Sequence, residues 1–571
     1  MFRENNKKYQ VSLFGMVHQL PLGVKKMLED SWAPAFRKLI FEKIDEKRYA
    51  VLYSDVASRP NFPVNVWVGL EIIKGLYDYT DEELMHQWHF NLLTAYALGE
   101  EGLGELTLCI RTVYYNRERL LEYEARIGRN LLEEEFKSIT DDALKELGVD
   151  TRTQRMDTSF VGSFIKKMSR LGIAVKVLQN FYKELSEVEQ RRWQPLLAEY
   201  LEEEAQHLSF RLKRSEVEAH LKKVGEWLFK LHEAYADDAT ISGLKSYQHM
   251  GRALREQFQV TQEKEEVTIE VKPAKEISSS SLQNPADDTA TFRRKGEEDN
   301  QGFVFDVAET CSTANPVQLL TDVSLYSNTI SDEAIATERV PEIKERTGVE
   351  EMITDAGFTG EASEKVCDAV GVALIPTEVK GRKLSEDEIS LKDFQFAEGR
   401  ITICPAGQFP AQEIHQEEKE RWLVRFSREQ CGGCPMVEKC PVIERQRFYS
   451  LYFNDRQAVV AQRRQKLNQE NYRVKCHLRP AVEGTVSQFK RKMHNGKLRV
   501  RGDGRARNVI IAMAIGINFR RIWTYLEEKK RVLASSLPLV AGLFVTLTVI
   551  FTRKWTRKRS MVQILVPETV W

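Results

Sequence analysis

The stretch CHLRPAVEGTVSQFK, residues 476–490, sets one carboxylate between two cations. Glu483 follows Arg479 by four positions and precedes Lys490 by seven. Because a helix turns about 100° per residue, these offsets predict that the three side chains share one helix face. A carboxylate beside cations suits a phosphate-handling site, in which the acid holds a metal ion and the cations hold a DNA backbone. The alternative is a solvated helix with an ordinary Arg–Glu pair.

Two earlier carboxylates stand in settings that match this helix. Asp157 lies in RMDTSFVGSF, and Asp355 lies in GVEEMITDAGF, where it follows an apolar strand-like run and precedes a glycine turn. The chain contains 84 acidic residues, so the spacing of three acids is not informative by itself. The residues around each acid carry the specificity.

Positive charge gathers around Glu483, although the whole chain of 571 residues has a net charge of zero. Residues 471–531 contain 16 Lys and Arg against 4 Asp and Glu, a net charge of +12. This excess predicts a surface for a polyanion, and the alternative is a basic face without a partner. The candidate phosphate contacts are Arg479, Ser487, Lys490, Arg491, Lys492, His494, Lys497, Arg499, Arg501, Arg505 and Arg507.

Four of the eight cysteines are grouped, in the pattern C-x26-C-x2-C-x5-C: Cys404, Cys431, Cys434 and Cys440. Gly and Pro in CGGCPMVEKC allow a tight turn in which thiolates converge on one tetrahedral ion, so the group predicts structural Zn²⁺. Reduced, metal-free thiols are the alternative. Four protein ligands leave no open position, so such an ion is not catalytic. The isolated cysteines are predicted to lie in the core: Cys109, Cys311 and Cys367.

At these residues the chain resembles the DDE transposases of bacterial insertion sequences, in the branch whose last acid lies in a Tyr-x2-Arg-x3-Glu-x6-Lys signature. Arg479, Glu483 and Lys490 fall on the Arg, Glu and Lys of that signature, whereas Cys476 occupies the Tyr position. Other segments resemble the same family: Arg59–Leu84, Leu106–Leu120, Ser281–Lys295 and Ile517–Ile522. The resemblance spans roughly residues 10–525.

The resemblance implies that Asp157, Asp355 and Glu483 hold Mg²⁺ or Mn²⁺, and that Arg479 and Lys490 grip the DNA backbone. Its implied partners are double-stranded DNA, as transposon ends and target, and a second copy of the chain in a homodimeric synaptic complex. Water is the first nucleophile, and the freed 3′-hydroxyl then attacks target DNA. Cys at position 476 lacks a ring face and is a weak donor, so we expect lower efficiency from this departure.

The expected fold class is α/β, with an RNase H-like catalytic core in which a mixed sheet with flanking helices carries Asp157 and Asp355 at adjacent strand ends. Glu483 then arrives on a packed helix. Residues 302–310 and 317–327 are strand candidates because they are apolar and bounded by turn residues. The first strand is the least supported, since TRTQRM before Asp157 has almost no apolar content.

The length predicts several domains around this core. Helical spacing from Val66 to Tyr77 and a capping pattern at Thr80 predict helices near the amino terminus. The predicted segments are an all-α DNA-binding domain (1–125), the first part of the core (126–180), a helical insertion (181–265), the second part of the core (266–380), a cysteine-rich insertion (381–450), the last part of the core with the Glu helix (451–528) and a basic and apolar tail (529–571).

Residues 532–552 carry no charge and are long enough to span a bilayer, although a packed hairpin or a divergent tail fits equally. We do not expect membrane association, because an anchor has no evident use in DNA cleavage. The amino terminus has no apolar run typical of a secretory signal, so a cytoplasmic location is expected. Two functions remain open: an active DNA transposase, and a catalytically inactive transposase-derived DNA-binding repressor.

Overall fold

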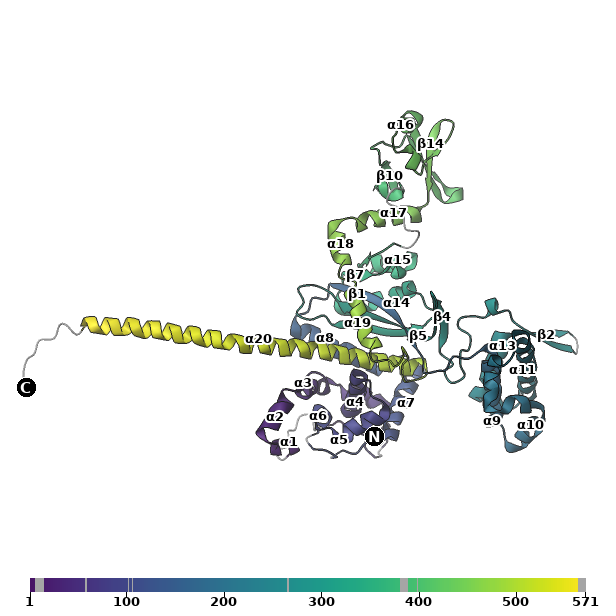
Figure 1. Ribbon diagram of the computed structural model, residues 1–571, viewed down its shortest axis with the longest axis horizontal. Helices are drawn as coiled ribbons and strands as arrows, with labels where there is room; N and C mark the ends of the chain where they lie inside the picture. The colour runs from purple at the N-terminus through teal and green to yellow at the C-terminus, as the bar shows by residue number, and fades with distance from the viewer. Residues whose placement is uncertain are drawn as a thin grey trace, which may run out of the picture.

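The computed structural model describes the backbone of residues 1–5, 15–56, 59–100, 102–104, 106–263, 266–379, 389–397 and 399–562, with side chains as far as Leu533. A central sheet lies in the middle of the protein, and most of the other elements are arranged around it (Figure 1). Helices of the amino-terminal part lie on one side, a separate helical unit lies beside the sheet, and a small β unit lies at the far end.

The amino-terminal part is helical: α1 (Met16–Gln19), α2 (Leu22–Glu29), α3 (Trp32–Leu39), η2 (Phe41–Lys43), η3 (Glu46–Leu52), α4 (Val64–Tyr77), α5 (Asp81–Phe90), α6 (Leu92–Ala97), α7 (Ile110–Ile127) and α8 (Leu131–Leu147). The helical spacing is confirmed by α4, and the capping box at Thr80 and Glu83 opens α5 as predicted. Helices continue to Leu147, beyond the predicted limit at residue 125. The reason is that Asn130 caps α8 by accepting from the amides of Leu132 and Glu133.

The central sheet is mixed, which confirms the α/β prediction. Its strands are β1 (Thr153–Gly162), β4 (Thr291–Lys295), β5 (Glu298–Thr310), β6 (Leu320–Ser327), β7 (Glu351–Thr354) and β8 (Ala373–Pro376), in the order β4-β5-β1-β7-β8, with β6 also paired to β5. Both strand candidates are confirmed, as β5 and β6. β1 runs antiparallel to β5 and parallel to β7, with Asp157 opposite Val307 and Arg155 opposite Ile353.

Polar side chains stabilise β1 where apolar content is missing. Gln154 is buried, accepts from the Thr321 hydroxyl (2.6 Å) and donates to the Thr347 hydroxyl (2.8 Å). Arg155 is also buried and donates to Glu309 (2.7 Å). A buried strand can carry such residues when each polar group finds a partner. The sequence TRTQRM therefore forms a central strand without an apolar pattern.

The two faces of the sheet pack against different helices. On one face, Met156, Val304 and Ala308 pack with α14 (Asp332–Thr347) and α15 (Glu361–Ala369). On the other face, Phe305 packs against Phe489 of α19 (Ala481–Lys490), with ring centroids 5.2 Å apart. That second core also includes α4 and the first part of α20 (Asp503–Val562). Both catalytic candidates on the sheet are thus held between packed layers.

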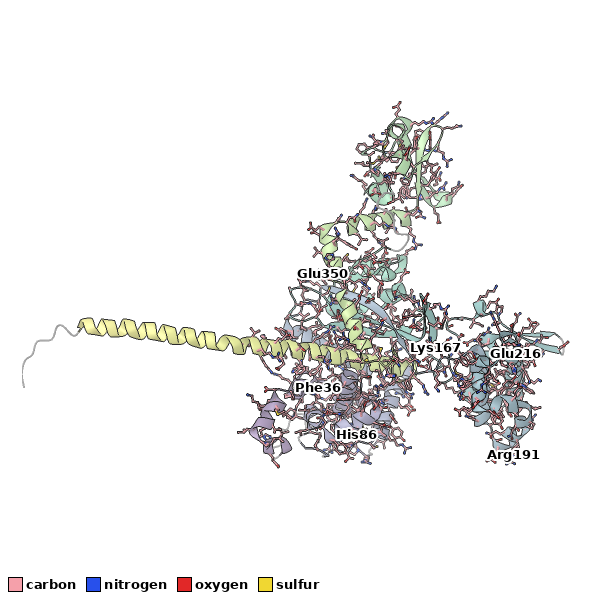
Figure 2. All side chains as sticks on the ribbon, in the orientation of Figure 1. Phe36, His86, Lys167, Arg191, Glu216 and Glu350 are labelled. Carbon is pink, nitrogen blue, oxygen red and sulfur yellow. The ribbon has the colours of Figure 1, made fainter. Side chains whose placement is uncertain are left out.

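A separate helical unit interrupts the sheet after β1. It comprises α9 (Arg170–Glu184), α10 (Glu187–Leu201), η4 (Glu203–Phe210), α11 (Arg214–Ala234), α12 (Ala239–Ser242), α13 (Lys245–Gln257) and the hairpin of β2 (Phe258–Glu263) and β3 (Glu266–Val271). Its limits differ from the predicted 181–265 because Ser169 caps α9, whose apolar residues belong to this unit's own core. Figure 2 shows the unit, with Arg191 and Glu216 labelled, beside the body of the protein.

A small β unit with its own core precedes the Glu483 helix. It contains η7 (Leu391–Asp393), β9 (Gln395–Ala397), β10 (Arg400–Ile403), β11 (Gln412–Gln416), η8 (Glu417–Lys419), β12 (Arg421–Ser427), α16 (Arg428–Gly432), η9 (Val437–Lys439), β13 (Ile443–Glu444) and β14 (Phe448–Phe453). The chain then returns to the sheet through α17 (Asp455–Leu467) and α18 (Glu470–Cys476).

One described helix segment, Asp503–Leu533 of α20, is long and apolar enough to cross a membrane by length and composition. However, 61% of its most apolar window is buried within the protein, which is typical of a core helix. The predicted apolar span at 532–552 lies almost wholly beyond the described side chains. Among the isolated cysteines, Cys311 and Cys367 are buried as predicted, whereas the prediction for Cys109 is wrong because this residue is exposed.

Candidate active site

Asp157 and Asp355 meet because their strands are parallel neighbours. Asp157 lies within β1, and Asp355 directly follows β7. The register that places Arg155 opposite Ile353 brings these two acids, each two residues further on, to the same place along the strands. Asp355 also caps a short turn, η6 (Ala356–Phe358), by accepting from the Gly357 amide at 2.6 Å.

Arg479 joins all three predicted acids. Its guanidinium lies 3.2 Å from Asp157 Oδ2, 3.8 Å from Asp355 Oδ2 and 3.2 Å from Glu483 Oε1. Three carboxylates from separate parts of the chain therefore surround one positive charge. This convergence is the main reason to regard the region as a site.

The predicted helix through Arg479, Glu483 and Lys490 needs a correction. Arg479 lies in the turn between α18 and α19, and only Glu483 and Lys490 share α19. Pro480 explains the break, because proline has no amide hydrogen and disfavours helical backbone at the preceding residue. The turn points Arg479 toward the acids, so it does not lie beside Lys490 on a helix face. Cys476, in the Tyr position, ends α18 and is half-buried.

The acids differ in their surroundings. Asp157 is 8% exposed, and burial raises its pKa to about 6, against the lowering effect of Arg479 and with a further increase from Asp355. The side chain of Glu483 is 65% exposed. The site thus combines a buried acid on a strand with an accessible acid on a helix.

A buried carboxylate positions α19 against the sheet. Glu309 of β5 accepts from Arg155 (2.7 Å), from the Thr485 hydroxyl (2.7 Å) and from Arg521 of α20 (2.8 Å). Arg155 also donates to the Leu478 carbonyl at 2.6 Å, next to Arg479. These bonds fix the turn and the helix that carry Arg479 and Glu483 relative to β1.

The donor set fits a hard divalent cation, because three carboxylates already share one cationic group. In the present arrangement, no three His, Cys, Asp or Glu residues within the described ranges form a ready metal cage. Asp157, Asp355 and Glu483 would hold the ion, and Arg479 would have to release them.

The predicted phosphate contacts divide according to their partners. Among these predicted contacts, three are exposed cations without an ion pair in the described part of the chain: Lys490, Arg491 and Arg505. Four are engaged: Arg499 with Asp78, Arg507 with Glu124, Lys497 with the Ile165 carbonyl and Arg501 with the Phe164 carbonyl. His494 is exposed, and Ser487 is half-buried on α19. Lys490, Arg491 and Arg505 are therefore the cations most available to a polyanion.

Lys492 departs from its predicted role. Its ammonium is buried and finds no hydrogen-bond partner in the part of the chain that the structure describes, so it is not presented to solvent for a phosphate. Burial, and then the charge of Arg520, lower its pKa to about 7, while Asp78 opposes the shift. Lys492 follows α19 and turns inward, whereas its neighbour Arg491 stays exposed.

Replacing this buried ammonium should stabilise the protein. Since its folded pKa lies below the ordinary lysine value, Lys492→Met should raise the free energy of unfolding by roughly 1–2 kcal/mol. The gain should be full below pH of about 7 and should shrink as the pH rises toward 10. Urea unfolding at pH 6 and pH 9 measures this, with exposed Lys490→Met as control. A destabilised Lys492→Met protein at pH 6 would contradict the assignment.

The four grouped cysteines line one small cavity of the β unit. Cys404 follows β10, Cys431 lies in α16, Cys434 follows α16, and Cys440 follows η9. Burial, and then the charges of the three other sulfurs, raise the pKa of the Cys431 thiol to about 11. The thiols are therefore neighbours, although they do not yet form a metal cage as placed.

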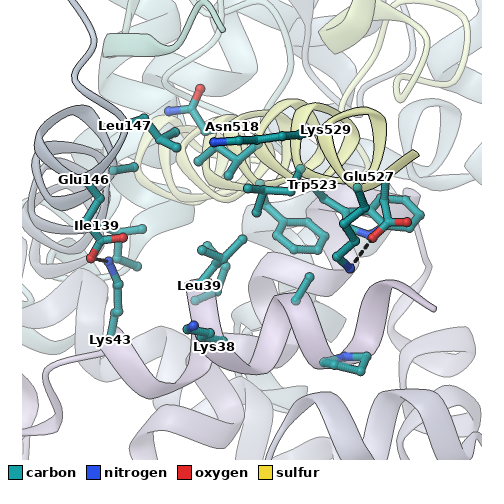
Figure 3. Close-up of a pocket in the computed structure, with 18 of the residues that line it drawn as sticks. Lys38, Leu39, Lys43, Ile139, Glu146, Leu147, Asn518, Trp523, Glu527 and Lys529 are labelled. Atoms are coloured by element: carbon teal, nitrogen blue, oxygen red, sulfur yellow. Dashed lines mark hydrogen bonds and ion pairs between the residues drawn. The ribbon is translucent and has the colours of Figure 1, made fainter. Parts of the chain in front are cut away.

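A larger cavity, of about 550 Å³, lies away from the acids, between α3, α8 and α20 (Figure 3). Its wall includes Leu39, Ile139 and Trp523, with Lys43 and Glu146 paired at its edge (2.5 Å). It contains none of the three acids. Cavity size therefore does not mark the candidate chemistry in this protein.

One acid near the site was missed by the sequence reasoning. The Thr158 hydroxyl donates to Asp332 Oδ1 at 2.9 Å, which places Asp332 next to the strand of Asp157. In the sequence, Asp332 follows Ser331, which caps α14. The pattern Ser-Asp-Glu is typical of a helix start, so the sequence around Asp332 predicts a helix cap and indicates no role in a site.

Residues 403–523 match the family model of the transposase DDE domain. The matched segment contains Arg479, Glu483 and the cysteine group, whereas Asp157 and Asp355 precede it. Comparisons with curated proteins and with solved structures give no match. The family match, together with the convergence of the three acids, supports a DDE transposase.

Proposed function

We propose that the protein is an active DNA transposase that cleaves phosphodiester bonds at the ends of an insertion sequence and joins the 3′-hydroxyl ends to target DNA. The convergence of Asp157, Asp355 and Glu483 on one cationic group carries this proposal. The family match over residues 403–523 supports the class of enzyme.

We further propose that the sheet is an RNase H-like core. In its support, β1, β5 and β6 form an antiparallel meander, and β7 and β8 add in parallel on the other side of β1. Asp157 lies on β1, Asp355 directly follows the adjacent strand β7, and Glu483 arrives on α19. The helical unit and the β unit then stand as insertions between the acids.

The residues of the site have distinct roles in this proposal. Mg²⁺ or Mn²⁺, held by the three carboxylates, supplies activation of the attacking hydroxyl and stabilisation of the leaving 3′-oxygen. Asp157 and Asp355 are fixed by the sheet, while Glu483 stays accessible to solvent and DNA. Arg479, once released from the acids, is placed to bind the phosphate being cut, because its planar fork fits phosphate oxygens.

The DNA path is proposed to follow the exposed cations beside the site. Lys490 and Arg491 extend from the end of α19, and Arg505 lies near the start of α20. The amino-terminal helices are proposed to bind the terminal repeats, and a homodimer is proposed to hold the two ends. These contacts make binding dependent on salt, because bound cations displace counterions from DNA.

Alanine substitution of each acid should abolish cleavage and leave DNA affinity nearly unchanged. Asp157→Ala, Asp355→Ala and Glu483→Ala each remove an oxygen donor that the metal requires, so Mg²⁺-dependent cutting of labelled transposon ends should fall by at least about 10³-fold. Asp368→Ala, an exposed acid on α15, is the control.

The same assay separates the two functions. Wild-type protein that binds the ends without cutting them would favour the inactive repressor. Normal cutting by any one of the three variants would exclude that residue from the site.

We also propose that the cysteine group holds one structural Zn²⁺. The support is that all four sulfurs line the same cavity, and that four cysteines are a ligand set of structural Zn²⁺ sites. A bound ion would link the segments of the β unit that carry the four cysteines.

Purified protein should therefore contain one zinc per chain without added metal. Cys434→Ser should release the ion and lower the melting temperature of the β unit, because metal binding contributes directly to the folding of small domains. Elemental analysis and calorimetry measure both effects, with Cys109→Ser, an exposed thiol outside the group, as the control. Well-folded protein without zinc would refute the proposal.

A further inference from the structure

Asp332 and Asp355 converge over the same glycine. A β-carbon built on Gly357 would lie 2.5 Å from Asp332 Oδ2 and 2.8 Å from Asp355 Oδ1. Both distances are shorter than real contacts of this kind, so a side chain at position 357 would displace the two carboxylates. The oxygens of a strand-end acid and of a helix-start acid are thus close neighbours.

A hydrogen bond fixes the other oxygen of Asp332. Oδ1 accepts from the hydroxyl of Thr158, the residue after Asp157, at 2.9 Å. Oδ2 is then directed toward Gly357 and Asp355. Asp332 also stands in the first turn of α14, where the helix amides favour a negative charge. Each of these contacts holds the carboxylate at the edge of the site.

Negative charge is in excess around these acids. Asp306 of β5 pairs with Thr158 in the sheet register and is 0% exposed, and neither of its oxygens has a hydrogen-bond partner among the described residues. Its neighbour Asp322 is balanced by Arg339 at 2.7 Å. Arg479 is the cation that the structure shows among Asp157, Asp355 and Glu483. Burial, and then the charge of Asp322, raise the pKa of Asp306 well above its ordinary value, so this carboxyl is a protonated, unpartnered polar group beside Thr158 within the described structure. The excess negative charge therefore belongs to Asp332 and the three acids around Arg479.

We propose that Asp332 is a fourth acid of the site and shares a divalent cation with Asp355, an assignment that rests on the proposed metal-dependent function. Asp332 Oδ2 and Asp355 Oδ1 supply two hard oxygen donors to the same ion, and Thr158 orients Asp332. The site then holds two cations with four carboxylates.

Direct Mn²⁺ binding to the metal-free full-length chain tests this without DNA. Asp332→Asn keeps the shape and a hydrogen-bond acceptor for Thr158 but removes the charge. It should weaken Mn²⁺ binding, measured by calorimetry and by electron paramagnetic resonance, by about tenfold or more. Thr158→Val should weaken it less, because the charge remains. Glu345→Ala, an exposed acid near the other end of α14, should bind as wild type does.

Wild-type affinity in a folded Asp332→Asn protein would overturn the assignment. Equal losses in Asp332→Asn and Thr158→Val would also overturn it, because Asp332 would then act only by positioning the strand of Asp157. If wild-type protein binds Mn²⁺ and cuts DNA while Asp332→Asn is unaffected, the proposed function stands and this inference fails. Wild-type protein that neither binds Mn²⁺ nor cuts DNA would defeat both.

Discussion

The buried carboxylate of Glu309 is the constraint on which the site depends. It is fully buried, and it accepts from Arg155 on β1, Thr485 on α19 and Arg521 on α20. A buried charge is tolerated when such partners satisfy it. Removal of one partner leaves a buried charge without full compensation in a low-dielectric interior. These bonds tie the strand of Asp157 to the helix of Glu483.

This arrangement explains how acids far apart in the chain can meet. The sheet brings Asp157 and Asp355 together through the pairing of β1 with β7. Glu309, on the other neighbour of β1, then places α19 across the same strand. The helical unit and the β unit each have their own core, so they lengthen the chain between the acids without entering this contact.

Sequence patterns predicted the helices and strands whose structure depends on residues close together in the chain. Helical spacing and a capping box predicted α4 and α5, and apolar runs predicted β5 and β6. The structure brings the three predicted acids to one cation, Arg479, and their role in a site stays a prediction. β1 has no apolar pattern because side chains of other elements form hydrogen bonds with its polar residues. These partners cannot be identified from the sequence.

The errors arise where tertiary contacts override a prediction made from local sequence. Pro480 moves Arg479 off the Glu483 helix and into the midst of the acids. Lys492 is one of several similar cations in the sequence, yet its position after α19 turns it inward. Asp332 looked like an ordinary helix-start residue, and only the packing of α14 beside Gly357 reveals its place. Charge and spacing identify candidates, but burial and partners decide their roles.

The most direct measurement of the central claim is the cleavage rate of Thr485→Val. This change removes the hydroxyl that links α19 to Glu309 and keeps the shape of the side chain. If the link positions Glu483, cutting of transposon ends should fall about tenfold or more while DNA affinity stays unchanged. The cost in stability should be only about 1–3 kcal/mol. Wild-type cleavage by this variant would contradict the account, because Glu483 would then reach the other acids without the Glu309 contact.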